Sequence, residues 1–406
     1  MSPPVTPASV AGTPGGPEGS RSSIRPADRR RLLGLAWAHL LNDGAANYLP
    51  GVLPAVLVSL HDPVRIAGVL IAALAAGQML QPVVGWFADR LGGRSLVVAG
   101  LLLSSLGGGL IGVAPTTWAL IVLLLLIGTG SAFFHPQALA GVRSMVEGRQ
   151  GLLTSVFLVG GELGRGIWPT VASVVVAHLG LGSLWIVALP GLVTVPVLFR
   201  LAPRLPARPH RQSRVRWRRH ARPMTLLIAY RCVRAFTIYA LVTFIPIMWQ
   251  FQGGSLVGGA SIITTMLVVG VIGNLWGGHL ADQLGRLPVL VISALAAAAL
   301  IFPVVYLHGA WVWIGAGCLG IPLFLTASTT ILIGQDIFPE NRSMGSGIAL
   351  GLANGIGALL VLVIGFWVNA SDVTTVFWII AGLGAASALL PRALPRQLLH
   401  DTTVRA

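Results

Sequence analysis

The stretch Gly85-Trp-Phe-Ala-Asp-Arg-Leu-Gly-Gly-Arg-Ser95 lies between two long apolar runs and recurs in weaker form as Gly278-His-Leu-Ala-Asp-Gln-Leu-Gly-Arg286. A second charged pair keeps the same offset, because Glu147-x-Arg149 is followed by Glu340-x-Arg342. Internal repeats of this kind in an apolar chain are typical of membrane proteins built from two similar halves. The sequence therefore predicts a duplicated membrane unit.

The composition agrees with this interpretation. The chain is 55% hydrophobic and 10% charged, with a mean hydropathy of +0.82, whereas soluble domains carry about 25% charged residues. Backbone groups in lipid must be satisfied within the segment, so each apolar span is expected to be a helix. We predict an all-α membrane protein with two pseudo-symmetric six-helix lobes. Its twelve spans are expected near residues 32–59, 65–88, 95–114, 117–143, 150–177, 182–202, 223–250, 256–281, 287–307, 310–335, 343–368 and 373–391.

Five regions follow from the spacing of these spans. A Pro-, Gly- and Ser-rich segment comes first and is expected to be a disordered cytoplasmic tail and not a cleaved signal peptide. The predicted order is that tail (1–31), the first lobe (32–203), a basic cytoplasmic linker (204–222), the second lobe (223–395) and a cytoplasmic tail (396–406).

The positive charge is distributed by membrane side. The net charge is +15 and all 27 basic residues are Arg. They gather before the first span, in residues 204–222 and in alternate loops, whereas the opposite loops hold almost none apart from Arg65. This asymmetry predicts a multi-pass protein of the cytoplasmic (inner) membrane with both termini in the cytoplasm. Contact with anionic lipids explains the basic linker better than binding to nucleic acid does, so no nucleic-acid partner is expected.

The sequence lacks the patterns of an enzyme. Cys232 and Cys318 lie inside predicted spans and form neither a disulfide framework nor a metal pair. We find no nucleophile–base pair, no metal-spaced histidine cluster and no phosphate-cradling glycine loop. We therefore expect no catalytic residues, no cofactor and no metal ion. The expected partners are a small-molecule substrate, protons and membrane lipids, and the chain is expected to act as a monomer.

Ionisable residues inside the spans are the candidates for function. His39 and Asp43 share one face of the first span, Glu162 and Arg165 lie one turn apart in the fifth, and Arg231 and Arg234 do so in the seventh. A charge at mid-membrane costs about 2.5–3.5 kcal/mol. These groups must therefore pair with one another or line a wet cavity.

Two interpretations stay open. In one, the charges only lock the two lobes, through fixed Asp43–Arg234 and Glu162–Arg165 pairs. In the other, they form a binding site with a titratable carboxylate. There Asp43 carries the proton, His39 relays it, and Glu162 is next in line. The proton-coupling candidates are Asp43, Glu162, His39 and His135; the substrate-binding candidates are Arg165, Arg231, Arg234, Asn47 and Tyr48. A neutral histidine bonded to a carbonyl explains His39 and His135 equally well.

The repeated loop has a mechanical explanation. Glycines allow a short turn to reverse direction, and charged side chains beside it can hold one side of a transporter shut. The predicted gating residues are Gly85, Asp89, Arg90, Gly92 and Arg94 in the first half, and Asp282, Gly285 and Arg286 in the second.

This loop and its weaker copy resemble the loop signature of the major facilitator superfamily, over residues 32–395. Four further segments are similar to the fosmidomycin-resistance branch of that superfamily, whose members are proton-driven drug exporters. They are His39-Leu-Leu-Asn-Asp43, Gln81-Pro-Val-Val-Gly85, Gly128-Thr-Gly-Ser-Ala-Phe-Phe-His-Pro136 and Gly151-Leu-Leu-Thr-Ser-Val-Phe-Leu-Val-Gly-Gly161. The resemblance maps His39, Asp43 and His135 onto polar positions of that branch. Glu162, Arg165 and Trp168 depart from it.

We therefore expect a proton-coupled antiporter that exports a small anionic or amphipathic compound by alternating access, as in drug efflux. Proton-coupled uptake of an organic anion is the alternative. A membrane sensor that transports nothing is the third interpretation.

Overall fold

The computed structural model describes residues 26–81, 83–84, 87, 92–145, 150–206, 217–338, 348–366 and 373–399. Within these ranges the regular elements are helices, together with one isolated bridge between Gly93 and Leu205. In chain order they are α1 (Pro26–Asn47), α2 (Leu49–Ser59), α3 (Ile66–Gln78), α5 (Ser95–Leu110), η1 (Ile111–Val113), α6 (Thr117–Arg143), α7 (Gln150–Leu179), η2 (Leu181–Ser183), α8 (Trp185–Leu201), α9 (Trp217–Phe251), α10 (Leu256–Leu284), α11 (Arg286–Tyr306), α12 (Trp311–Phe324), α13 (Ala327–Ile337), η3 (Ile348–Leu352), α15 (Ala353–Gly365), α16 (Val373–Ser387), η4 (Leu390–Ala393) and α17 (Arg396–Leu399).

These helices account for the twelve predicted spans. The first span is divided into α1 and α2 at Tyr48, and Pro50 lies in the first turn of α2, where a missing N–H costs little. The tenth span is divided into α12 and α13, and the described part of the eleventh starts with the π-helix η3. Eight of the described helical segments are long and apolar enough to cross a membrane. The chain is a multi-pass membrane protein.

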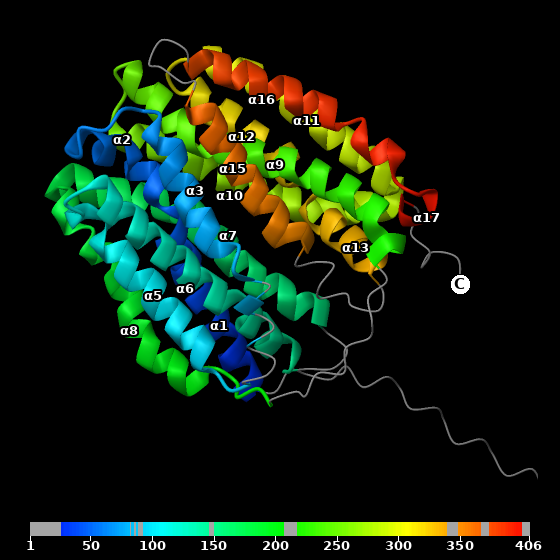
Figure 1. Cartoon of the computed structure of the whole chain (residues 1–406), viewed down its shortest axis with the longest axis horizontal. Helices are drawn as coiled ribbons and strands as arrows, with labels where there is room; N and C mark the ends of the chain where they lie inside the picture. The colour runs from blue at the N-terminus through cyan, green and yellow to red at the C-terminus, as the bar shows by residue number, and fades with distance from the viewer. Residues whose placement is uncertain are drawn as a thin grey trace, which may run out of the picture.

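The two halves of the chain form two groups of helices (Figure 1). In the first half α1 packs on α7, and α5 packs on α6 and α8; in the second half α10 packs on α12, and α11 packs on α16. Close approach of helix backbones needs small residues. At Gly128, for example, an added Cβ would lie 2.9 Å from Cα of Gly77, where α6 crosses α3. The predicted fold of two six-helix lobes is confirmed, whereas the boundaries given above for the five regions stay a prediction.

The two ends of the bundle differ in their surface residues. One end, which we call the basic end, carries Arg94, Arg200, Arg392 and Arg396 in or beside its turns, together with the buried Arg286. The other, which we call the opposite end, carries exposed tryptophans in the first turns of three helices: Trp118, Trp185 and Trp311. Tryptophan is enriched where a membrane meets water.

The lobes meet along a seam, formed where α2 contacts α9 and α10, α3 contacts α15, and α7 contacts α10. At Gly68 of α3, a Cβ atom would lie 2.8 Å from the carbonyl oxygen of Val361 on α15. The hydroxyls of Thr170 on α7 and Thr264 on α10 are 2.7 Å apart. The contacts at Gly68 and Thr170 lie in the half of the bundle nearer the opposite end, and the contact of α3 with α15 continues to Met79, whose side chain packs against Gly355.

Candidate functional site

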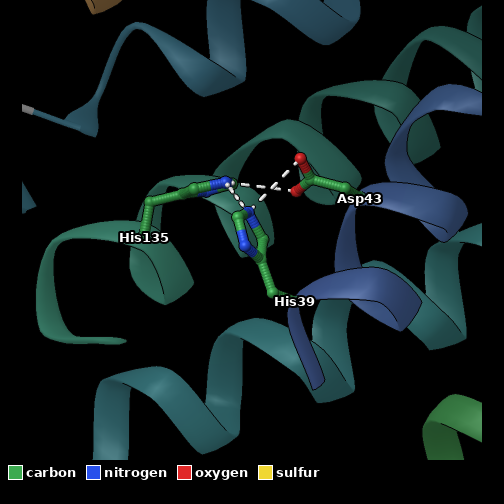
Figure 2. Close-up of side chains that lie close together, drawn as sticks. All are labelled: His39, Asp43 and His135. Carbon is green, nitrogen blue, oxygen red and sulfur yellow. Dashed lines mark hydrogen bonds and ion pairs between the residues drawn. The ribbon is translucent and has the colours of Figure 1, made fainter. Parts of the chain in front are cut away.

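Asp43 on α1 is the centre of the site (Figure 2). Its side chain is buried, and its carboxylate faces two histidines and an arginine. Oδ1 lies 3.1 Å from Nε2 of His135, and Oδ2 lies 3.5 Å from Nε2 of His39 and 3.3 Å from Nη2 of Arg165. Asn42 donates from Nδ2 to Oδ1 over 3.2 Å. The site thus joins side chains of α1, α6 and α7 within the first lobe.

Glycines on α7 place these groups together. A Cβ atom added at Gly160 or Gly164 of α7 would collide with the backbone of Ala36 or Leu40 of α1. The absence of side chains at these glycines therefore lets the two helices pack at close range. The neighbouring Gly161 leaves room for the His39 ring, whose Cδ2 would be 2.9 Å from an added Cβ. Gly44 of α1 in turn accommodates Trp168 of α7, at the position that departs from the resembling branch.

Each histidine is fixed by its other ring nitrogen. Nδ1 of His39 lies 2.8 Å from the carbonyl oxygen of Phe157, and that ring stacks on the Phe157 ring with centroids 4.1 Å apart. Nδ1 of His135 lies 2.8 Å from the carbonyl oxygen of Ser131. The two Nε2 atoms face each other at 3.2 Å. Each histidine thus has the carbonyl contact expected of a neutral ring. That contact involves only Nδ1, so the Nε2 atom of each ring faces Asp43.

Arg165 connects the two carboxylates. Its Nη1 lies 3.6 Å from Glu162, and its Nη2 lies near Asp43 as described above. The predicted Glu162–Arg165 pair is confirmed. The side chains of Arg165 and His135 are 35% and 26% exposed, whereas that of Asp43 is 3% exposed. Asp43 therefore lies beneath an accessible layer of positively charged or protonatable groups.

The alternative pair Asp43–Arg234 is wrong. Arg234 of α9 is buried in the second lobe, where it donates to the Ser293 hydroxyl at 3.0 Å and to the carbonyl oxygens of Pro322 and Leu323 at 2.5 and 2.7 Å. These carbonyls belong to the last turn of α12, whose hydrogen bonds end at the break before α13. The guanidinium satisfies that helix end, so it is not available to the carboxylate of Asp43.

Arg231 lies elsewhere on α9. Its Nη2 is 3.5 Å from Oδ1 of Asn354, and its Nε is 3.5 Å from the carbonyl oxygen of Ala349 in the π-helix η3. Asn354 also lines a cavity of about 50 Å³ between the lobes, together with Gln78 and Gln81 of the first lobe. Within the described residues, Arg231 and Arg234 make no ion pair.

Asn47 and Tyr48 interact with main-chain atoms. Asn47 donates from Nδ2 to the carbonyl oxygen of Asp43 over 2.8 Å, one turn earlier in α1. Tyr48 is buried, and its hydroxyl donates to the carbonyl oxygen of Gly108 on α5. Because it is buried against α5, Tyr48 is not brought to the site as predicted. A substrate role for Asn47 stays a prediction.

Tyr239 of α9 is a residue that the sequence analysis missed. It lies within electrostatic range of Arg165, Glu162 and Asp43 in the first lobe and of Arg231 in the second. The available signal was its spacing, since Tyr239 follows Arg231 by about two helical turns and shares its face. Tyr239 places a polar group of the second lobe beside the charges of the first.

The gating residues are described in part. Gly92 and Gly93 have φ values of 59° and 73°, and Gly285 has 85°, so all three adopt the left-handed region that glycine tolerates. Nη1 of Arg94 approaches the Arg200 carbonyl oxygen at 3.4 Å, and Arg286 pairs with Asp336 at 2.6 Å within the second lobe. Gly85, Asp89 and Arg90 lie outside the described residues. The gating role of these residues and of Asp282 stays a prediction.

Known proteins resemble the chain along most of its length. Residues 35–361 match the family model of the Major Facilitator Superfamily. The chain is 26% identical to the "Uncharacterized MFS-type transporter YfnC" of Bacillus subtilis (strain 168) over 386 residues, which are 89% of this chain and 92% of the relative. It is also 26% identical to the "Fosmidomycin resistance protein" of Escherichia coli (strain K12) over 374 residues, which are 88% and 91% of the two chains.

Solved structures show the same fold. A bacterial homolog of the human lysosomal transporter Spinster, in an inward-facing and occupied conformation, matches with a TM-score of 0.77 and 15% identity, and covers 94% of this chain and 100% of that chain. The peptide transporter POT in complex with sulfate matches with a TM-score of 0.74 and 15% identity, over 92% and 96% of the two chains. The duplicated halves, the helices of the described residues and these matches agree: the chain belongs to the major facilitator superfamily, a family of transporters and not of enzymes.

Proposed function

We propose that this transporter exports a small anionic or amphipathic compound in exchange for protons, by alternating access. The basic end then faces the cytoplasm of the inner membrane, as the distribution of arginine favours. Because the lobes meet nearer the opposite end, the site would be loaded from the cytoplasm in this conformation. The name of the fosmidomycin-resistance relative supports export.

The single observation that carries the proton coupling is the meeting of Asp43 with two Nε2 atoms. The Nδ1 atoms of His39 and His135 face carbonyl oxygens, which only accept hydrogen bonds, so the protons of the neutral rings belong on Nδ1. Three acceptors then converge, namely two Nε2 atoms and the carboxylate. Three acceptors without a hydrogen between them repel one another, and a proton shared among them removes this repulsion. An intramembrane site that requires a proton is what a proton-driven transporter needs.

The carboxylates of Asp43 and Glu162 couple that proton to the substrate. A compound that presents a donor or a cationic group to Asp43 or Glu162 competes with the proton for the carboxylate. Substrate and proton then occupy the site in turn, and this exchange is antiport. Within the substrate class proposed here, the paired carboxylates favour an amphipathic compound that carries such a group.

Uptake of an organic anion is a second candidate, because the partly exposed guanidinium of Arg165 favours it. An anion that takes Arg165 away from Asp43 leaves the carboxylate free to bind a proton. Substrate and proton would then bind together, which gives symport. The two candidates therefore differ in the sign of one measurement, since lowering the pH weakens substrate binding in antiport and strengthens it in symport.

The test uses the full chain in proteoliposomes that contain a pH-sensitive dye. Fosmidomycin is the first probe, followed by compounds that a thermal-shift screen selects from phosphonates, organic acids, siderophores and antibiotics. We expect Asp43→Asn to abolish transport against a gradient driven by pH, while substrate exchange without a gradient continues. Asp62→Asn is the matched control, because Asp62 accepts a hydrogen bond from Thr117 near the opposite end, away from the site.

Gradient-driven, pH-dependent transport by Asp43→Asn would place the coupling on another group, with Glu162 next. Stronger substrate binding at low pH would select uptake over export. A chain that binds a compound but never moves it across the vesicle membrane would be a sensor.

A further inference from the structure

The geometry points to a second ligand for the same three side chains: His39, Asp43 and His135 form a binding site for a divalent transition-metal cation of the Zn²⁺ class. Their ligand atoms lie within 4.8 Å of one another, and none of the three is adjacent in sequence to another. The spacing along the chain hid this set, which is why the sequence analysis expected no metal. The inference uses the Asp43 site but does not rest on proton coupling.

The ring nitrogens are in the state that a metal requires. A metal binds the unprotonated nitrogen of a neutral imidazole, and the other ring nitrogen then donates to a carbonyl or carboxylate that fixes the tautomer. His39 meets this condition through the carbonyl of Phe157, and His135 through that of Ser131. Both Nε2 lone pairs therefore point into the space beside Asp43 (Figure 2).

The separations fit a metal of this size. Zn²⁺ binds histidine nitrogen and carboxylate oxygen at about 2.0–2.2 Å, so neighbouring ligand atoms in a tetrahedron are roughly 3.3–3.6 Å apart. The three separations here are 3.2 Å between the Nε2 atoms, 3.1 Å from His135 to Oδ1 and 3.5 Å from His39 to Oδ2. The two contacts of Asp43 end on different oxygens, so one carboxylate oxygen has to turn toward both rings before the three groups occupy three corners of such a tetrahedron. One ligand atom of each residue already lies within 4.8 Å of the other two.

The side of the site that carries His135 and Arg165 is its more accessible side. His135 is the most exposed of the three ligands, and Arg165 beside it is also partly exposed. A water molecule or an anionic donor of a substrate can complete the coordination there. Arg165 opposes the charge of the cation, but it has Glu162 as an alternative partner on its own helix. Imidazole ligands favour Zn²⁺ and its neighbours over Mg²⁺ and Ca²⁺.

The test measures metal binding directly, by a readout separate from transport. The full chain is purified with a histidine-free tag, treated with a chelator and dialysed against Zn²⁺, and bound zinc is measured by mass spectrometry. Co²⁺ then replaces Zn²⁺, and its visible absorption reports the geometry. We expect one tight site per chain that excess Mg²⁺ does not displace.

Two substitutions of the same residue separate a ligand from a structural role. Loss of an outer partner alone weakens metal sites about 10–100-fold, so His135→Ala is expected to weaken Zn²⁺ binding more than about 100-fold. His135→Cys supplies a thiolate and keeps the site. His279→Ala is the matched control, since His279 is exposed on α10 with Gln283 Nε2 at 3.0 Å.

Equal Zn²⁺ binding by wild type and His135→Ala overturns the site, and so does an equal loss in His279→Ala. Transport is measured in parallel with a chelator present. Gradient-driven transport that persists there supports the proposed function even if zinc fails to bind. Zinc binding together with uncoupled transport in wild type contradicts the proposed function and leaves the metal site standing.

Discussion

The guanidinium of Arg165 contacts two carboxylates, one of which is more buried than the other. Glu162 lies on the same helix and is partly exposed, whereas Asp43 is buried on another helix. A planar guanidinium can donate to two acceptors at once, which a lysine ammonium does less well. Arg165 can therefore exchange Asp43 for a substrate without becoming an unpaired charge in the membrane.

At the residue scale, we predict that Gly161→Ala disables the site. The new methyl group would collide with the His39 ring, which the Phe157 stack and carbonyl hold in place. Overpacking of this kind costs about 1–3 kcal/mol, so we expect a lower unfolding temperature together with loss of proton-coupled transport. Gly382→Ala is the control, because nothing lies within 4 Å of an added Cβ there. Equal effects of the two substitutions would contradict the steric explanation.

The sequence predicts which residues form the site better than it predicts which of them pair with one another. The spacing of His39 and Asp43 predicted that they share a helix face, and they do. The pairing of Asp43 with Arg165 and not with Arg234 could not be predicted. Charge and depth were similar for both arginines, and the rotation of α9 about its axis decides which way its charges point. His135 was a candidate as a histidine inside a predicted span, but its contact with Asp43 could not be predicted, and Tyr239 was not a candidate at all.

At the scale of elements, the carbonyls left free at the break between α12 and α13 are satisfied by side chains of the same lobe. Helix ends leave carbonyls without partners, and a buried end needs a donor. Arg234 supplies that donor from α9, and Ser293 of α11 adds its hydroxyl to the Pro322 carbonyl at 2.6 Å. Three helices of the second lobe are thereby tied at one point. Arg234, which the sequence predicts to bind substrate, acts here as a cap for the end of α12.

We predict that Arg234→Met destabilises the fold more than Arg231→Met does. A buried carbonyl left without a partner costs about 1–3 kcal/mol. Arg234→Met removes the Arg234 donor from the Leu323 carbonyl and one of the two donors from the Pro322 carbonyl, whereas the two contacts of Arg231 are long. Thermal unfolding of the purified variants measures the difference. Arg231→Met should instead weaken substrate binding with little loss of stability. Equal unfolding temperatures would show that the Arg234 contacts carry no net stabilisation.

At the scale of the whole molecule, the seam predicts a crosslink. The hydroxyls of Thr170 and Thr264 touch across the lobes, so cysteines at both positions are within the reach of a disulfide. In a chain with Cys232 and Cys318 replaced by alanine, we expect oxidation of Thr170→Cys with Thr264→Cys to form the bond and stop transport. A reductant should restore it. Thr170→Cys alone is the control, and a crosslinked chain that still transports would show that the seam does not open.

Orientation gives a further prediction for the whole chain. In the same cysteine-free background, Gly182→Cys lies at the opposite end and Arg204→Cys at the basic end, and both positions are exposed. A membrane-impermeant maleimide added to intact cells should label residue 182 and not residue 204, because arginine-rich loops stay in the cytoplasm. The reverse pattern would invert the topology and with it the direction of transport.

The position of the seam also determines how far the ends of the helices move when one lobe rotates against the other. From Thr264 at the seam to the end of α10 at Leu284, the helix extends for about 30 Å at 1.5 Å per residue. This length is a lever arm whose fulcrum is the contact between the lobes. A rotation of about 15°, comparable to known subunit rotations, would move the far end by about 8 Å, which is the width of a small organic molecule. At Gly68 two backbones meet at this fulcrum, whereas apolar side chains of α2, α9 and α10 belong to one buried cluster where these helices meet, so the turning of the lever has to keep or separate those side-chain contacts.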